Sequence, residues 1–318
     1  MSIDQVKKIC YNPNMEKNKI IIDTDPGHDD ALAIFLLEKS GLLEIHAITT
    51  VAGNSTIENV TNNARYILNL LNSKTPLYSG APKPISRELV KAVVHGEGGL
   101  EGANITIQEP LTGNAVDKII SIVHENPDEI SIVAIGPETN IAQAFIKDPE
   151  LPSLIKQIVI MGGAINVPGN KNRVAEFNIF VDPEAADTVF KADVKKVLIP
   201  LDVCNDTILQ ISDFEKLKGS VLYEPVLKMM DKYIIGLMAG EKVSGALMYD
   251  PLAAYYLINP EAYNLEPMDI KIETNSKLTR GMTVAEQRTW AEKYPNVFVV
   301  KSIDAGAFKK DFIEILRK

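Results

Sequence analysis

Short apolar runs alternate with helix-period segments along most of the chain, and this alternation constrains the fold more than any other feature. The predicted strands are 20–22, 44–51, 130–135, 158–161 and 197–201. The predicted helices lie near 56–71, 114–125, 138–146 and 183–191. Strands separated by helices run parallel and are covered on both faces. We therefore expect an α/β fold with a central, mostly parallel sheet and a Rossmann-like core.

The second half of the chain differs from this pattern. Beyond residue 213 it is mostly helical up to about residue 258, which predicts a helical cap over the site. Short strands and a last helix at about 304–316 follow. We expect a polar leader over residues 1–18 and a single domain over 19–318. With 46% hydrophobic residues, a chain of 318 residues can bury a core of that size.

Charge and cysteine content narrow the possible partners. The formal net charge of −9, without a Lys/Arg cluster, argues against nucleic acid as a partner. No signal segment and no bilayer-length apolar stretch is visible, which predicts a cytoplasmic protein that binds no membrane. Cys10 and Cys204 are too few and too far apart for a disulfide framework or a zinc site, so we expect two free thiols.

An acidic cluster follows the first apolar run. Its members are Asp23, Asp25, Asp29 and Asp30. The proline and glycine at 26–27 should turn the chain from a buried strand into a helix that begins near Asp29, so the four side chains are expected to converge at one strand end. Carboxylates so close repel one another unless one is protonated or a cation lies among them. Helix capping could explain one or two of them, but a metal or ribose site explains all four.

Further polar loops follow other predicted strands, at 52–54, 136–140 and 162–164. Ligands of α/β proteins bind where the carboxyl ends of parallel strands meet. These loops should therefore surround the acidic cluster.

Several blocks, in order along the chain, resemble the inosine-uridine-preferring nucleoside hydrolases, which are calcium-dependent N-ribohydrolases. DTDPGHDDA at 23–31 is similar to the family's N-terminal signature, and the later blocks are TVAGN at 50–54, HGE at 95–97, GPETNI at 136–141, MGGA at 161–164, VAEFNI at 174–179, DPEAA at 182–186 and DPLA at 250–253. The resemblance covers about residues 19–258. Ordered blocks are more specific than a single motif.

The resemblance implies a role for each matching residue. The carboxylates of Asp25, Asp30 and Asp250 and the backbone carbonyl of Ile135 would bind Ca²⁺. Asp25 would also be the general base, and Asp29 would bind a ribose hydroxyl. The remaining sugar-binding positions would be Asn54, Asn170, Glu176 and Asn178.

The expected reaction is hydrolysis of the N-glycosidic bond of a ribonucleoside to ribose and free base. Breaking this bond places positive charge on the sugar ring, which an acidic pocket stabilises. A metal ion would orient hydroxyl groups and lower the pKa of water. The segment around Tyr233, Met238 and Lys242 should wall the base, and the resemblance implies a homo-oligomer, a dimer or tetramer.

The chain departs from the family at Tyr249, where the best-described members have a histidine that protonates the leaving base. A phenol with a pKa of about 10 is a poorer acid than imidazole at neutral pH. We expect leaving-group activation through Tyr249, His95 or another pocket group, or packing of Tyr249 against the base. His95 lies in a glycine-containing loop and is the best candidate for a site histidine. His28 occupies a position that we expect to tolerate substitution.

Structural roles and other functions stay open at this point. Asp250 before a proline could cap a helix, Asn54 after a glycine could serve a turn, and Glu176 with Asn178 could face water from an edge segment. One alternative function is a catalytically weak protein that binds a ribosyl ligand. Another is a haloacid-dehalogenase-like phosphatase, because Asp23 and Asp25 after a strand resemble its nucleophile and acid pair.

Overall fold

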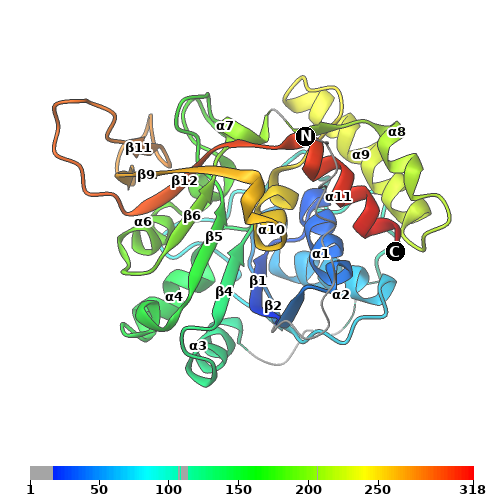
Figure 1. Cartoon of the computed structure of the whole chain (residues 1–318), viewed down its shortest axis with the longest axis horizontal. Helices are drawn as coiled ribbons and strands as arrows, with labels where there is room; N and C mark the ends of the chain where they lie inside the picture. The colour runs from blue at the N-terminus through cyan, green and yellow to red at the C-terminus, as the bar shows by residue number, and fades with distance from the viewer. Residues whose placement is uncertain (1–16, 107, 109–113, 206) are drawn as a thin grey trace, which may run out of the picture.

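The computed structural model describes residues 17–106, 108, 114–205 and 207–318. Within these residues, eight strands form a central sheet in the order β3-β2-β1-β4-β5-β6-β12-β9 (Figure 1). The strands are β1 (Asn18–Thr24), β2 (Leu43–Thr50), β3 (Leu77–Ser79), β4 (Ile130–Ala134), β5 (Gln157–Met161), β6 (Lys196–Ile199), β9 (Tyr263–Met268) and β12 (Val297–Ile303). Neighbouring strands are parallel except at one edge, where β9 runs antiparallel to β12. The predicted α/β fold is confirmed.

Helices cover both faces of the sheet (Figure 1). They are α1 (His28–Ser40), α2 (Ile57–Leu70), α3 (Ala115–Glu125), α4 (Thr139–Lys147), α6 (Pro183–Lys191), α10 (Tyr249–Ile258) and α11 (Ala305–Arg317). Successive strand residues point to opposite faces. Ile20 and Ile22 of β1 therefore pack in the core that contains α1, α10 and α11, whereas Ile21 packs in the core that contains α3, α4 and α6.

A cap lies beside the carboxyl ends of the strands. Its longest element is α9 (Tyr223–Gly240), and its shorter elements are α7 (Leu201–Cys204), α8 (Ile211–Phe214) and a small sheet of β7 (Ile208–Leu209) and β8 (Ala246–Leu247). A further short helix, α5 (Phe177–Val181), precedes these elements in the chain. The prediction of a mostly helical segment from about residue 213 to about residue 258 is confirmed, apart from the two-residue strand β8.

Predicted and observed boundaries agree closely, because buried strands and amphipathic helices carry strong local periodicity. The structure adds β3 at one sheet edge. The short strands predicted beyond residue 258 are β9 and β12 in the central sheet and a hairpin of β10 (Ile270–Ile272) and β11 (Thr283–Ala285). The predicted strand at 197–201 is shorter than expected, because α7 begins at Leu201. The predicted leader, apart from residues 17–18, and Cys10 lie outside the described residues, whereas Cys204 is a buried free thiol.

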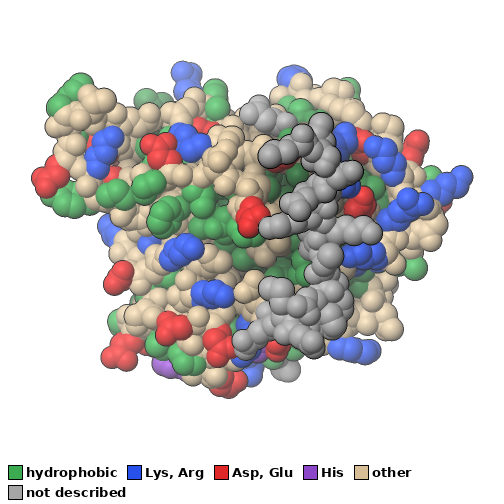
Figure 2. Space-filling view, viewed as in Figure 1, with side chains coloured by type: hydrophobic (Ala, Val, Ile, Leu, Met, Phe, Trp, Pro, Cys, Tyr) green, Lys and Arg blue, Asp and Glu red, His purple; other side chains and the backbone are tan. Residues whose placement is uncertain are grey.

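The surface carries both signs of charge. Acidic and basic side chains are interspersed over the face seen in Figure 2. Among the described residues, no helix combines the length and the apolar character that a bilayer span requires.

Candidate active site

The turn from β1 into α1 brings three aspartates to the carboxyl edge of the sheet. Asp30 is tied to this turn: its Oδ2 accepts from the backbone N–H of Gly27 at 2.9 Å, and its Oδ1 accepts from the Thr24 hydroxyl at 2.5 Å. Asp29 lies in the same first helical turn but has a buried Oδ1 without a hydrogen-bond partner among the described residues. Helix capping therefore accounts for Asp30 and leaves Asp29 unexplained.

A fourth carboxylate comes from the far end of the chain. Oxygens of Asp29, Asp30 and Asp250 lie within 4.8 Å of one another, and all three residues are buried. Asp250 is the second residue of α10, whose N-cap is Met248, so the expectation that Asp250 might cap this helix is wrong. The structure therefore joins the motif at β1 to a residue more than two hundred positions later.

Burial controls the electrostatics of this group. It raises the pKa of Asp29 and of Asp250 well above their usual range, and the neighbouring Asp30 raises both further. Burial also raises the pKa of Asp25, with Asp30 as the second cause. A cation among these carboxylates would reverse these shifts.

The donor set fits a divalent cation that prefers oxygen. Oδ1 of Asp25 and Oδ1 of Asp29 are both buried without a hydrogen-bond partner in the described residues. Buried carboxylate oxygens without donors are costly unless a cation binds them. Asp29, Asp30 and Asp250 form the tightest set, and Asp25 flanks it. The resemblance implies Asp25, Asp30, Asp250 and the Ile135 carbonyl as ligands and Asp29 as a sugar contact, and this assignment stays a prediction.

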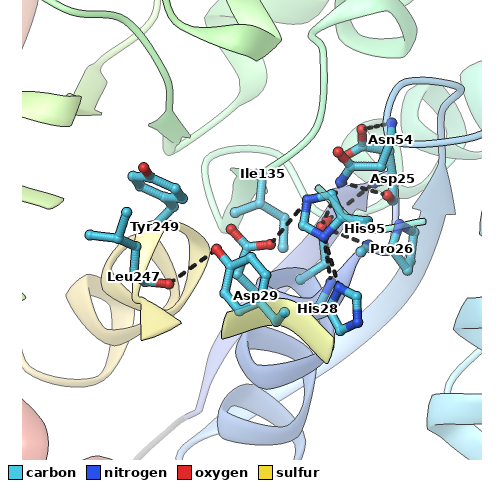
Figure 3. A network of polar contacts seen from close by, with 12 residues as sticks. Asp25, Pro26, His28, Asp29, Asn54, His95, Ile135, Leu247 and Tyr249 are labelled. Atoms are coloured by element: carbon cyan, nitrogen blue, oxygen red, sulfur yellow. Dashed lines mark hydrogen bonds and ion pairs between the residues drawn. The ribbon is translucent and has the colours of Figure 1, made fainter. Parts of the chain in front are cut away.

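Asn54 holds two of the aspartates in place. Its backbone N–H donates to Oδ2 of Asp25 at 2.6 Å, and its side-chain amide donates to the Asp25 carbonyl and to Oδ2 of Asp30, both at 3.1 Å (Figure 3). Gly53 permits this approach, because a Cβ there would lie 2.1 Å from Oδ2 of Asp25. Asn54 thus does more than form a turn, and it also lines the cavity described below.

Asp23 does not join the cluster, so the expectation that all four aspartates converge is wrong for this residue. Its Oδ1 accepts from the Thr49 hydroxyl at 2.5 Å and from the Asn140 side chain at 2.8 Å. Burial raises its pKa to about 7. Asp23 therefore ties β1 to β2 and α4 instead of facing the other aspartates.

Glu176 and Asn178 lie at the start of α5, so the alternative of an edge segment facing water is wrong for them. Glu176 is the N-cap and accepts from the backbone N–H groups of Asn178 at 2.8 Å, Ile179 at 3.1 Å and Gly163 at 3.1 Å. Burial raises the pKa of Glu176 to about 7. The Asn178 amide donates to the Ile135 carbonyl at 3.2 Å.

His95 is buried in a stacked aromatic group, and His28 is part of it. The rings of His28, His95 and Tyr233 stack pairwise, with centroids 5.2 to 5.5 Å apart. His28 Nε2 lies 2.9 Å from the Glu101 carbonyl, and its Nδ1 lies 2.9 Å from Nδ1 of His95 (Figure 3). The expectation that His28 tolerates substitution is therefore contradicted by its burial and contacts.

Nδ1 of His95 is enclosed by His28. The backbone N–H of His28 donates to it at 3.3 Å, and Nδ1 of the His28 ring lies 2.9 Å away. Nε2 of His95 faces Oδ1 of Asp29 at 3.9 Å. Burial lowers the pKa of His95 well below its usual range, which favours the neutral imidazole.

Asp29 and Asp250 line a cavity of about 270 Å³. All predicted substrate-binding residues line it, as do His95, Ile135, Tyr249 and Asp250. Of the segment expected to wall the base, Tyr233 lines the cavity, whereas Met238 and Lys242 are exposed.

Two further charged residues, Lys171 and Glu241, line the cavity and were not predicted. Lys171 adjoins the predicted Asn170, and Glu241 directly follows α9, so proximity to predicted site segments was the available signal. The Tyr249 hydroxyl donates to Oε2 of Glu241 at 2.8 Å.

Known proteins share both this sequence and this fold. The family model described as inosine-uridine-preferring nucleoside hydrolase matches residues 20–310. The pyrimidine-specific ribonucleoside hydrolase RihA of Shigella boydii serotype 4 (strain Sb227) is 38% identical over 297 residues, which cover 91% of this chain and 95% of that protein.

Solved structures agree. A plant nucleoside hydrolase, PpNRh1, superposes with a TM-score of 0.88 at 29% identity, covering 95% of this chain and 99% of its own. A purine-preferring ribonucleoside hydrolase from Gardnerella vaginalis superposes with a TM-score of 0.87 at 28% identity, covering 94% and 98%. The phosphatase alternative is thereby overturned. The chain belongs to the inosine-uridine-preferring nucleoside hydrolase family, whose metal-dependent members hydrolyse ribonucleosides to ribose and free base.

Proposed function

We propose that the protein hydrolyses pyrimidine ribonucleosides in a Ca²⁺-dependent reaction. The observation that carries the hydrolase function is the convergence of Asp29, Asp30 and Asp250, flanked by Asp25, beside a cavity that Asp29 and Asp250 line. The pyrimidine preference is supported by 38% identity, across 91% of this chain, to a relative named pyrimidine-specific. Calcium is supported by the donor set, because it accepts an irregular shell of carboxylate and carbonyl oxygens.

The acidic end of the cavity stabilises the transition state. As the glycosidic bond breaks, positive charge develops on the ribose, and buried carboxylates in a water-poor site lower the energy of that charge. Asp25 is the proposed general base. Its Oδ2 is held by Asn54, while its Oδ1 has no hydrogen-bond partner among the described residues and can accept a proton from water.

A divalent cation held by the aspartates would supply the positive charge that lowers the pKa of water and orients ribose hydroxyls. Asp30 and Asp250 are its proposed ligands, with Asp25 and the carbonyl of Ile135 completing the set. Asp29 belongs to the same cluster and is proposed to bind either the cation or a ribose hydroxyl.

The opposite side of the sugar is proposed to rest on α5. Glu176 and Asn178 line the cavity and are held by backbone contacts, so they present fixed hydrogen-bonding groups to ribose. Asn170 lines the same cavity from a more exposed position. His95 is proposed to hydrogen-bond the substrate through Nε2, because its Nδ1 is occupied by contacts with His28.

The test is ribose release from uridine, cytidine, inosine, adenosine and guanosine, with Ca²⁺ and with chelator, by wild type and Asp25→Ala. Ribose from the pyrimidine nucleosides that disappears in both the chelated and Asp25→Ala samples is expected. Ribose mainly from purine nucleosides would refute the pyrimidine preference. Calorimetric binding without any ribose would instead identify the weakly catalytic binding protein.

Other sequence predictions remain proposals. A homo-oligomer, a cytoplasmic location and a single domain over 19–318 follow from the resemblance and the composition. Light scattering coupled to size-exclusion chromatography tests the first, and a protein that elutes only as a monomer would refute it. One cooperative calorimetric transition is expected for the single domain.

A further inference from the structure

The wall of the cavity formed by the end of α9 and the start of α10 contains an isolated polar pair. Glu241 directly follows α9, and Tyr249 is the first residue of α10. The Tyr249 hydroxyl donates to Oε2 of Glu241 at 2.8 Å, and both residues line the cavity that also contains Asp29 and Asp250. In Figure 3, Tyr249 and His95 lie on opposite sides of the Asp29 carboxylate.

This pair accepts hydrogen bonds but has none to donate. The one proton of the tyrosine hydroxyl is used in the contact with the carboxylate. What remains is the second carboxylate oxygen and a lone pair on the phenol oxygen. A buried phenol beside a carboxylate also holds its proton strongly, since burial and then Glu241 raise the pKa of Tyr249. Tyr249 is thus poorly suited to act as an acid.

No Lys or Arg in the described part of the chain forms a salt bridge with Glu241, and Nζ of the adjacent Lys242 instead donates to the Ala239 carbonyl at 2.9 Å. The neighbouring lining residues Tyr233, Leu237 and Gly240 carry no positive charge. Lys171 lines the same cavity, but its Nζ lies 3.4 Å from the Lys91 carbonyl and 5.3 Å from the centre of the Phe177 ring. The carboxylate is half-buried and can accept a hydrogen bond from a ligand.

The lining of the cavity contains two kinds of side chain. The aspartates and α5 supply groups suited to ribose hydroxyls, and the aromatic and aliphatic side chains of Tyr233 and Leu237 beside Glu241 suit a planar base. A base placed there presents its hydrogen-bonding edge to an acceptor. An exocyclic amino group would donate to it, whereas a carbonyl at the same position would face another acceptor and be repelled.

We infer that Glu241 and Tyr249 form an acceptor pair that selects ribonucleosides whose base carries an exocyclic amino group, and hence cytidine over uridine. The inference rests on the proposed function, because it uses the ribose and base ends of that site. Cytosine and uracil have nearly the same size. At position 4 they carry an amino group and a carbonyl, and at N3 an acceptor and an N–H donor, so the inference places the position-4 group against the pair, where only cytosine donates. Because the two bases are so similar in size, comparing them measures the hydrogen bond to Glu241 and Tyr249 and not the size of the base.

The test compares kcat/KM for cytidine and uridine in wild type, Glu241→Gln and the control Glu224→Gln. Glu224 lies on the exposed first turn of α9, so its substitution removes the same charge from the same helix away from the cavity. The wild type and the control should favour cytidine by on the order of tenfold or more. Glu241→Gln should lower the cytidine-to-uridine ratio by roughly ten- to a hundredfold, because its amide can donate to the uracil carbonyl.

Calorimetry on the Ca²⁺-loaded Asp25→Ala protein separates this inference from the proposed function. It measures the ratio of dissociation constants for cytidine and uridine without turnover. Tighter cytidine binding that Glu241→Gln abolishes supports the acceptor pair, even if no ribose is released by the wild type. Equal or tighter uridine binding, or a ratio that Glu241→Gln and Glu224→Gln leave equally unchanged, overturns the inference.

Discussion

Replacing Glu176 by glutamine tests how the buried carboxyl group at the start of α5 is held. The Glu176 side chain is almost entirely buried from solvent, and its two carboxyl oxygens accept hydrogen bonds from three backbone N–H groups. In the glutamine variant, one of these oxygens becomes an amide nitrogen that faces a backbone donor. An unsatisfied buried donor costs about 1–3 kcal/mol, which should destabilise the variant wherever the wild-type group is neutral.

The pH dependence of this difference follows from the pKa. Burial raises the pKa of Glu176 from its ordinary value of 4.5 to about 7 in the folded protein. Between these values only the folded state keeps the proton, so this group makes the wild type less stable as pH rises. Glutamine does not titrate. From pH 5 to pH 8 the variant should therefore gain about 2–3 kcal/mol relative to the wild type, at about 1.36 kcal/mol per pH unit.

Urea unfolding at pH 5 and pH 8, in the presence of chelator, measures this difference directly. Chelator keeps both proteins in the same metal-free state, so the contribution of the aspartate cluster cancels. The variant should be less stable than the wild type at pH 5 and close to it or more stable at pH 8. Glu224→Gln should show no such change, because that residue is exposed. A Glu176→Gln difference that is equal at both pH values would refute the burial argument.

Three further perturbations have defined outcomes. Gly53→Ala should reduce kcat by at least about a hundredfold, because its Cβ would lie 2.1 Å from Oδ2 of Asp25, whereas Gly98→Ala meets nothing within 4 Å and should stay active. Equal activities would contradict this. His28→Ala should lower the free energy of unfolding by about 2–4 kcal/mol in urea, because it removes a buried ring stacked on His95, and a loss below about 1 kcal/mol would count against that packing. Chelation should lower the melting temperature by on the order of 5 °C relative to saturating Ca²⁺, and no calorimetric shift would argue against a bound cation.

Local sequence patterns were sufficient for the central fold. The parallel strands and covering helices follow from the spacing of apolar side chains. This spacing can be read within each element, because a strand or a helix repeats the direction of its side chains at a fixed interval. The elements that escaped prediction are short or lie at edges. β3, for example, has only 3 residues, none of them fully buried, which is too short for an alternating pattern to identify it as a strand.

Within the site, sequence alone was sufficient to group Asp25, Asp29 and Asp30. They are close along the chain, at the point where a strand ends and a helix begins. Tertiary packing decided the rest. It turned Asp23 toward Thr49 and Asn140, since strand pairing sets which side chains face each neighbour.

Packing of α10 against α1 brought Asp250 to the cluster, and packing of α9 against β8, which lies just before α10, brought Glu241 to Tyr249. The physical reason is that local periodicity fixes which face of an element is apolar. Which polar groups meet across two elements depends on how those faces pack, and no short stretch of sequence contains that information.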